Sequence, residues 1–173
     1  MMYWQLSNRA NRIAAALADR HYTRQKPGSR QFVPPGRCIV LLTPSHDALW
    51  VSSWPFAQYV KHQWAGAWIC SLFRNEAPDV YMSSELIRQA VAVTRSIWND
   101  IPPLGMVTFV DAVKVRSVNP GYCYKQAGFH RVGLTKSGLV TLQLLPDEMP
   151  PSFPPFSAQE SLFQRGGVYG SSL

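Results

Sequence analysis

Apolar residues in the first part of the chain follow helical spacing and then give way to turn-forming residues. Residues 4–20 predict a helix capped by Ser7 or Asn8. Its apolar face, with spacings of three and four, would consist of Ile13, Ala14, Leu17 and Ala18. Residues 20–36 are basic and contain Pro27-Gly28 and Pro34-Pro35-Gly36. Because these dipeptides interrupt both helices and strands, we expect a surface loop there.

Short apolar runs predict the strands. They cover residues 38–43, 48–54, 64–73, 105–111, 129–132 and 139–145. The first two are joined by Ser45-His46-Asp47, which predicts a hairpin. Beyond Pro146 the chain is rich in proline and weakly patterned, so we expect a tail that wraps the surface or is partly mobile.

Two further helices are predicted between these strands. The first follows a loop over residues 74–82, is capped by Ser83 or Ser84 and ends near Trp98. The second is short; it opens at Asn119-Pro120-Gly121 and is stopped by Gly128. A strand, a helix and another strand in residues 64–111 predict an α+β domain built on a twisted mixed sheet flanked by helices. We expect one domain over residues 1–145, with a basic helix and loop in 1–37, the sheet in 38–145 and a tail in 146–173.

The charge is concentrated in two blocks. The 173 residues carry a net charge of +7. Residues 1–40 hold seven cations against Asp19 alone, and residues 114–136 hold five cations and no acid. Such blocks favour a polyanionic partner, for which we predict double-stranded DNA, although a solvated basic surface is the alternative. The DNA-binding candidates are Arg20, Arg24, Lys26, Arg30 and Arg37.

The cysteines and histidines do not form a recognised pattern. Cys38, Cys70 and Cys123 are widely spaced, which argues against a disulfide framework and favours a cytoplasmic location. No ligand spacing predicts a structural metal. No segment has the length or apolar character of a membrane span or of a signal peptide, so no membrane partner is expected. A homodimer is compatible with the sequence, which does not fix the oligomeric state.

The segment from Asn119 to Phe129 is the most informative motif. It reads NPGYCYKQAGF and resembles the closing motif of GNAT superfamily acyltransferases, in which Asn precedes a short helix bearing Tyr-x-x-x-Gly-Phe. Here that pattern runs from Tyr124 to Phe129. The resemblance covers residues 64–145 and implies a GNAT-like fold, a general-acid role for Tyr124, and acetyl-CoA or another small-group donor. The glycine-rich pyrophosphate loop usual in that family is absent after Arg74, where Glu76 and Asp79 would repel phosphate and Ser83 and Ser84 remain as anion-binding candidates.

Further short motifs resemble the Mom family of bacteriophage DNA-modifying proteins. They are His21-Tyr22-Thr23, Phe73-Arg74-Asn75-Glu76, Val110-Asp111, and the two tyrosines Tyr122 and Tyr124. The resemblance implies conversion of the exocyclic amine of adenine in DNA to a carbamoylmethyl derivative, which protects phage DNA from host restriction. Such a reaction requires a base for the amine and a flipped nucleotide. The catalytic candidates are His21, Tyr22, Arg74, Asp111 and Tyr124, followed by Glu76 and Tyr122.

Other interpretations of these residues remain open. Asp111 is also suited to capping a turn, Tyr124 to core packing, and Arg74 with Glu76 to a surface ion pair. Tyr122 and Tyr124 are two residues apart and do not share one helix face. An alternative function is an acyl-CoA-dependent N-acetyltransferase acting on a small-molecule or protein amine. A third is a non-catalytic DNA-binding module on the same fold.

Overall fold

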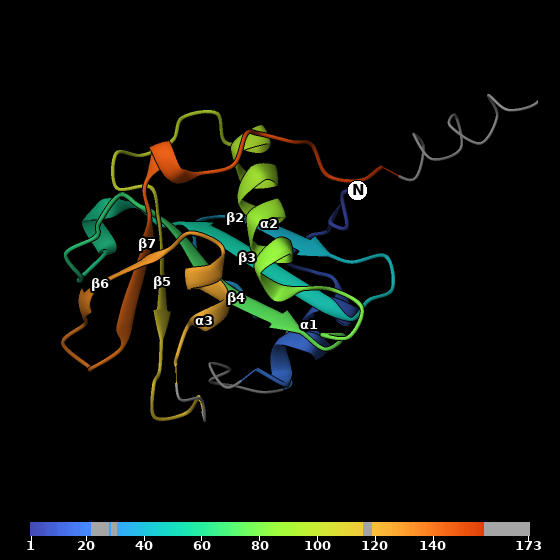
Figure 1. Cartoon of the computed structure of the whole chain (residues 1–173), viewed down its shortest axis with the longest axis horizontal. Coiled ribbons are helices and arrows are strands. Elements are labelled where there is room, and N and C mark those ends of the chain that lie inside the picture. Colours follow the sequence, from blue (N-terminus) through green and yellow to red (C-terminus); the bar gives the residue numbers. More distant parts are fainter. Residues whose placement is uncertain (22–27, 29–30, 116–118, 158–173) are drawn as a thin grey trace, which may run out of the picture.

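A seven-stranded mixed sheet in the order β1-β2-β3-β4-β5-β7-β6 forms the centre of the chain (Figure 1). The computed structural model describes residues 1–21, 28, 31–115 and 119–157. The strands are β1 (Gln5–Leu6), β2 (Arg37–Leu42), β3 (Ala48–Trp54), β4 (Trp68–Asn75), β5 (Met106–Val110), β6 (His130–Leu134) and β7 (Val140–Leu144). The helices are α1 (Arg12–Asp19), α2 (Ser83–Ile97) and α3 (Tyr122–Gln126), with short 3₁₀ turns η1 (Ala57–Tyr59) and η2 (Pro146–Glu148). The expected α+β class with a twisted mixed sheet is therefore confirmed.

Helices cover the sheet on both faces. Figure 1 shows α2 and α3 on the near face, where Trp4, Trp50 and Trp68 are fully buried in the larger hydrophobic core. On the opposite face Leu17 of α1 packs with Val40 of β2 and apolar residues of β3 and β4. Among the described residues, no helix has both the length and the apolar character that crossing a bilayer requires.

The first predicted helix is shorter than expected. Gln5 and Leu6 form a strand that pairs with Leu42 and Leu41 of β2, and α1 starts only after Asn11. The Asn11 side chain accepts hydrogen bonds from the backbone N–H groups of residues 13 and 14, so Asn11 rather than Ser7 or Asn8 is the cap. The reason is tertiary, because Trp4 is buried under α2 and its Nε1 donates to the Leu86 carbonyl at 2.8 Å.

Other boundaries follow the predictions closely. The hairpin of β2 and β3 is confirmed, and so are strands near the C-terminal end of the sheet and the stop at Gly128, whose φ is +103°. The third strand begins at Trp68 instead of Trp64, because residues 62–66 form turns. The cap of α2 is also different: Met82 occupies the N-cap position without a side-chain hydrogen bond, and Ser83 and Ser84 are its first helical residues.

Residues 146–157 return along α2 toward the N-terminal strand. The Phe153 N–H donates to the Ala92 carbonyl at 3.1 Å, and the Phe156 N–H donates to the Trp4 carbonyl at 2.8 Å. The Arg95 guanidinium also donates to the Pro150 carbonyl at 2.6 Å. This part of the predicted tail thus packs along the surface of the domain, and the rest of the tail lies outside the described residues.

Candidate active site

The parallel strands β4 and β5 pair only over their first halves. Pairing runs from Trp68 opposite Met106 to Cys70 opposite Thr108, whereas β4 continues to Asn75. The register between β3 and β4 skips Ser71, which marks a β-bulge at the place where β4 leaves β5. Figure 1 shows the two arrows pointing apart, with α3 lying near the gap. A bulge and a separation of strands leave backbone groups and side chains available to a ligand at the sheet's interior.

A cavity of about 230 Å³ lies at this separation. Its polar walls come from four elements or their ends and consist of His21, Asn75, Ser83, Cys123 and Tyr124, while Phe73 and Val110 supply apolar surface. The bulge explains why Phe73 faces this side, because it reverses the alternation set by Trp68 and Cys70. The structure therefore brings three predicted site residues together: His21, Ser83 and Tyr124.

His21 lies just beyond α1 and closes one side of the cavity. Its backbone N–H donates to the Ala18 carbonyl at 2.9 Å, which continues the helical turn. Burial, with the nearby positive charge of Arg74, lowers the pKa of the imidazole to about 4, and a hydrogen bond to the Phe73 backbone partly opposes that shift. His21 is consequently neutral at pH 7 and presents an imidazole rather than an imidazolium to the cavity.

Tyr124 projects from α3 into the gap between β4 and β5. Its hydroxyl lies 3.6 Å from the Cys70 Sγ, and its ring packs edge-on against Phe73 and Phe129, with centroids 6.2 and 5.5 Å away. Burial chiefly raises the pKa of this hydroxyl well above its ordinary value. The phenol remains protonated at neutral pH, so it can donate a hydrogen bond or a proton.

Asn75 ends β4 and organises the loop over residues 76–82. Its Nδ2 donates to the Tyr81 carbonyl at 2.9 Å and to the Ser83 Oγ at 3.1 Å, and its Oδ1 accepts from the Ala77 N–H at 3.0 Å. The N–H groups of Val80 and Tyr81 donate to the Ala77 carbonyl. Most backbone N–H groups of this loop donate to acceptors within the loop or beside it, and Pro78 has no N–H group. The loop is therefore not a phosphate cradle.

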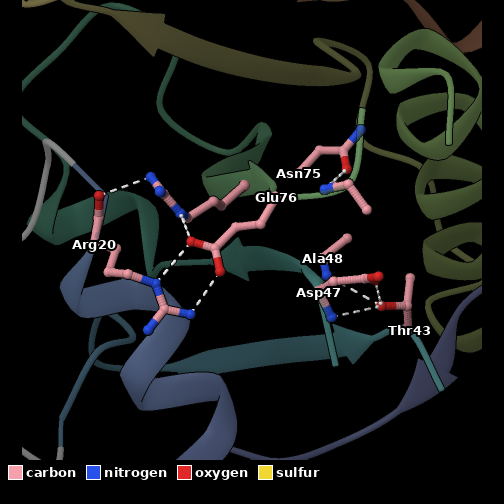
Figure 2. Close-up of polar contacts among 8 residues, drawn as sticks. Arg20, Thr43, Asp47, Ala48, Asn75 and Glu76 are labelled. Atoms are coloured by element: carbon pink, nitrogen blue, oxygen red, sulfur yellow. Dashed lines mark hydrogen bonds and ion pairs between the residues drawn. The ribbon is translucent and has the colours of Figure 1, made fainter. Parts of the chain in front are cut away.

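Glu76 is held by two arginines at the edge of the cavity. Its carboxylate accepts from Arg20 Nε at 2.7 Å and Nη2 at 2.6 Å, and from Arg74 Nε at 2.7 Å. Figure 2 shows the Arg20 and Glu76 side chains facing each other. The hydrogen bonds from Arg20 are the largest cause that lowers the Glu76 pKa to about 2. Glu76 is thus a poor proton acceptor. The two guanidinium groups also neutralise the negative charge that would otherwise repel a phosphate.

The same cluster fixes the position of His21. The Arg74 Nη1 donates to the Arg20 backbone carbonyl at 2.7 Å, and the Glu76 N–H donates to the Asp47 carbonyl at 2.8 Å. Figure 2 places Asp47, with Thr43, at the neighbouring β2–β3 turn. Arg20 and Arg74 therefore join the end of α1 to the end of β4, and Arg74 with Glu76 forms the ion pair that the alternative interpretation expected.

Two other catalytic candidates lie outside the cavity lining. Asp111 follows β5, and its Oδ1 accepts from the Val113 and Lys114 N–H groups at 3.0 and 3.2 Å, as the turn-capping alternative expected. Tyr122 is 56% exposed on α3, so the prediction that the two tyrosines occupy different faces is confirmed. Ser84 lies in the first turn of α2 but does not line the cavity.

The predicted DNA-binding set is only partly described. Arg24, Lys26 and Arg30 lie outside the described residues, as does the catalytic candidate Tyr22. Arg37 starts β2 opposite Trp54, with its guanidinium 4.0 Å from the indole centroid. Asn75, at the cavity, is opposite Ala48 at the other end of β3. The length of β3 separates Arg37 from the cavity by about 20 Å, so the structure does not bring it to the site.

Sequence reasoning missed two polar residues of the cavity. Asn75 belongs to the Phe73-Arg74-Asn75-Glu76 motif but is not among the predicted site residues. Its position at the end of a buried strand is the sequence signal that points to it. Cys123 was dismissed as one of three scattered cysteines, and its thiol pKa is raised chiefly by burial. Among the described residues, no group of three or more His, Cys, Asp or Glu side chains is placed to hold a metal ion.

The chain matches no family model and no curated protein. It is similar in structure to a crystal structure of the aminoglycoside acetyltransferase AAC(6')-Ib in complex with coenzyme A, with a TM-score of 0.54 and 16% sequence identity. The match covers 86% of this chain and 96% of that one. At this identity the similarity shows the fold, which is GNAT-like, as the closing motif predicts. The resemblance to the Mom family stays a prediction.

Proposed function

We propose that this chain is a GNAT-like group transferase that joins a small acyl-type group to an amine in the cavity between β4 and β5. The single observation that carries the proposal is the pairing of a neutral imidazole, His21, with a protonated phenol, Tyr124, on the walls of one cavity. The structural neighbour is an acetyltransferase, which is an activity of the same class.

The two side chains suit the two proton transfers of such a reaction. An amine that attacks a carbonyl carbon must lose a proton, and the neutral His21 imidazole is able to accept one. The leaving group gains negative charge as its bond to the carbonyl carbon breaks, and the Tyr124 hydroxyl is able to donate to it. Asn75 and Ser83 hold the opposite wall, where their polar atoms are already oriented by the hydrogen bond between them.

A coenzyme A thioester, the donor that the fold implies, does not fit all of this site. The bulge and the apolar walls suit a narrow amide-bearing arm. The loop over residues 76–82 offers no glycine cradle for a pyrophosphate, and most of its donors are engaged internally. The first turn of α2, which has no side-chain cap, retains backbone N–H groups for an anion. The proton transfers assigned to His21 and Tyr124 do not depend on the identity of the donor.

The acyl-CoA alternative is tested by direct turnover. Purified protein is incubated with acetyl-CoA and a panel of amines that includes an aminoglycoside, a polyamine and a peptide, and the released thiol is measured. The proposal expects thiol release that depends on the amine and is lost in His21→Asn and Tyr124→Phe. Tyr122→Phe is the matched control, because Tyr122 is exposed and outside the cavity. Equal turnover in all three variants would remove this cavity from the reaction.

A second candidate is modification of adenine in DNA, which the charge distribution favours. Residues 114–136 carry five cations and no acid. Of these, Lys114 lies beside Val115 of the cavity wall, and Lys125 lies on α3, where its Nζ donates to the Asn119 Oδ1 at 2.8 Å. Cations on the segments that line a cavity suit an acceptor presented on a phosphate backbone. The transferred group would be the carbamoylmethyl-type group implied by the Mom resemblance.

Mass spectrometry of nucleosides separates the two candidates. DNA from cells that express the chain is digested and compared with DNA from cells that express Tyr124→Phe. A deoxyadenosine species bearing one extra small amide, present only with the wild-type chain, supports the DNA reading. The acyl-CoA-dependent N-acetyltransferase is favoured if deoxyadenosine stays unmodified in cells with confirmed expression and thiol release in vitro depends on the amine.

A further inference from the structure

A second cavity of about 470 Å³ lies on the face of the sheet opposite α3. Its walls come from the loop before β4, from β5 and from the β6–β7 hairpin, and its main residues are Lys61, His62, Trp64, Phe109, Leu134 and Lys136. We call this the rear groove. Phe109 lines it, whereas the next residue of β5, Val110, lines the candidate active site. Neighbouring residues of a strand point to opposite faces, so the two cavities are separated by the thickness of the sheet at one end of β5.

Three aromatic rings are clustered in the rear groove. The His62 ring centroid is 4.9 Å from that of Phe109 and 6.0 Å from that of Trp64, and the Trp64 and Phe109 centroids are 6.1 Å apart. Trp64 is 6% exposed and therefore rigid, and burial lowers the pKa of His62. Gly133 of β6 lies beside the indole, because a Cβ there would be in ordinary van der Waals contact with it at 3.9 Å. Such a cluster offers fixed ring surface against which a planar ligand can stack.

The charges of the rear groove are all positive. Lys61 and Lys136 line it from opposite walls, and none of the lining residues is acidic. Both lysines are exposed, so their ammonium groups are accessible to a ligand. A buried polar atom lies nearby: Thr141 is opposite Phe109 in β7, is fully buried, and its Oγ1 has no hydrogen-bond partner among the described residues. Residues directly opposite in an antiparallel pair share a face, so Thr141 lies on the groove side of the sheet.

We propose that the rear groove binds single-stranded nucleic acid, with one base against the His62 and Phe109 rings and the flanking phosphates at Lys61 and Lys136. Aromatic rings combined with cations and without acids are the usual features of such surfaces, because every base has a stacking face and every nucleotide a negative charge. Duplex DNA keeps its bases stacked inside, so it does not present this base surface. This binding site does not depend on the transferase activity proposed above and would hold even if that proposal failed.

Fluorescence anisotropy with a labelled oligothymidylate tests the proposal on the full chain. Lys136→Gln is compared with Arg12→Gln, which removes one exposed charge at the start of α1. We expect Lys136→Gln to weaken binding several-fold and to lower the slope of log K against log salt by about 1, whereas Arg12→Gln leaves both unchanged. Equal effects of the two variants would show that only the net charge matters and would overturn the proposal.

Loss of the rings tests the stacking half of the proposal. His62→Ala removes a ring from a loop, and Phe109→Leu removes one from β5 while keeping an apolar side chain. Each is expected to weaken oligothymidylate binding by about tenfold and to leave the weaker binding of inorganic polyphosphate, which has charges but no bases, unchanged. His62→Ala keeps the test informative if Phe109→Leu destabilises the fold. Wild-type affinity for oligothymidylate in His62→Ala, or polyphosphate binding as tight as oligothymidylate binding, would overturn the proposal.

Discussion

The Tyr124 hydroxyl lies 3.6 Å from the Cys70 Sγ, at the last residue where β4 still pairs with β5. Opposite Cys70, the Thr108 Oγ1 donates to the Cys70 carbonyl at 3.1 Å. The tyrosine thus reaches the point where the two parallel strands separate, and its hydroxyl is surrounded by weakly polar groups. Burial keeps the hydroxyl protonated at neutral pH, so it is available to donate a hydrogen bond to a leaving group.

Tyr124→Phe is therefore expected to lower turnover strongly without unfolding the chain. The ring contacts with Phe73 and Phe129 are retained, and the hydroxyl loses its contact with the Cys70 sulfur and its hydrogen bond with the Thr108 side chain. We expect kcat to fall by about 10²-fold while the midpoint of urea unfolding changes little. Tyr122→Phe, on the exposed side of α3, should leave both quantities unchanged. If Tyr124→Phe retains full kcat, the phenol is not the proton donor.

Glu76→Gln is expected to disturb the end of α1 rather than to remove a proton acceptor. The change weakens the bonds from Arg20 and Arg74 that join α1 to β4. Since the carboxylate is partly exposed, the cost in the free energy of unfolding should be about 1 kcal/mol. We expect KM to rise because His21 is less well positioned, with the pH dependence of kcat unchanged. A lost limb in the pH profile of kcat would instead identify Glu76 as a base.

The strands and the closing helix were predictable because their signals are local. Apolar runs and Gly128 after a short helix reflect backbone and burial preferences within a few residues. The predicted first helix extends too far toward the N-terminus, because the strand at Gln5–Leu6 exists only through its pairing with β2. No pattern within the first twenty residues carries that information.

The part of the candidate site that was predictable also depends on local signals in the sequence. Tyr124 was found through a motif, and His21 through its place in a short basic segment, and both line the cavity. Glu76 and Arg20 were assigned separate roles as base and phosphate contact, yet they form one ion pair across 56 positions of sequence. The bulge at Ser71, which turns Phe73 toward the cavity, has no sequence signal because serine is unremarkable in a strand.

Gly121→Ala is expected to destabilise the chain by placing a methyl group against β7. Gly121 precedes α3 with φ +78°, and a Cβ there would lie 2.4 Å from the Leu142 Cδ1. Gly138→Ala is the matched control, because its φ is +85° but nothing lies within 4 Å of its Cβ position. Alanine at either position adopts the same unfavourable backbone conformation. We therefore expect Gly121→Ala to lower the free energy of unfolding by ~1–3 kcal/mol more than Gly138→Ala does. Equal values in urea titrations would mean that α3 moves freely away from β7.

The stability of the chain should fall between pH 6.5 and pH 4 through His21. The folded state holds this imidazole with a pKa of about 4, below the ordinary 6.5, so in that interval the unfolded chain binds more protons. This stability is fully present above pH 6.5 and is lost as the pH falls, and the loss reached at pH 5 is at most about 2 kcal/mol. His62, whose pKa is also lowered, acts with the same sign.

Urea unfolding at pH 7 and pH 5 measures this contribution. We expect His21→Asn to reduce the difference between the two pH values more than His62→Asn does, because the shift at His21 is the larger one. Glu76 does not interfere, since its pKa of about 2 places its loss of stability below pH 4.5. If the wild-type chain and His21→Asn lose the same free energy from pH 7 to pH 5, the imidazole is not held neutral at the cavity.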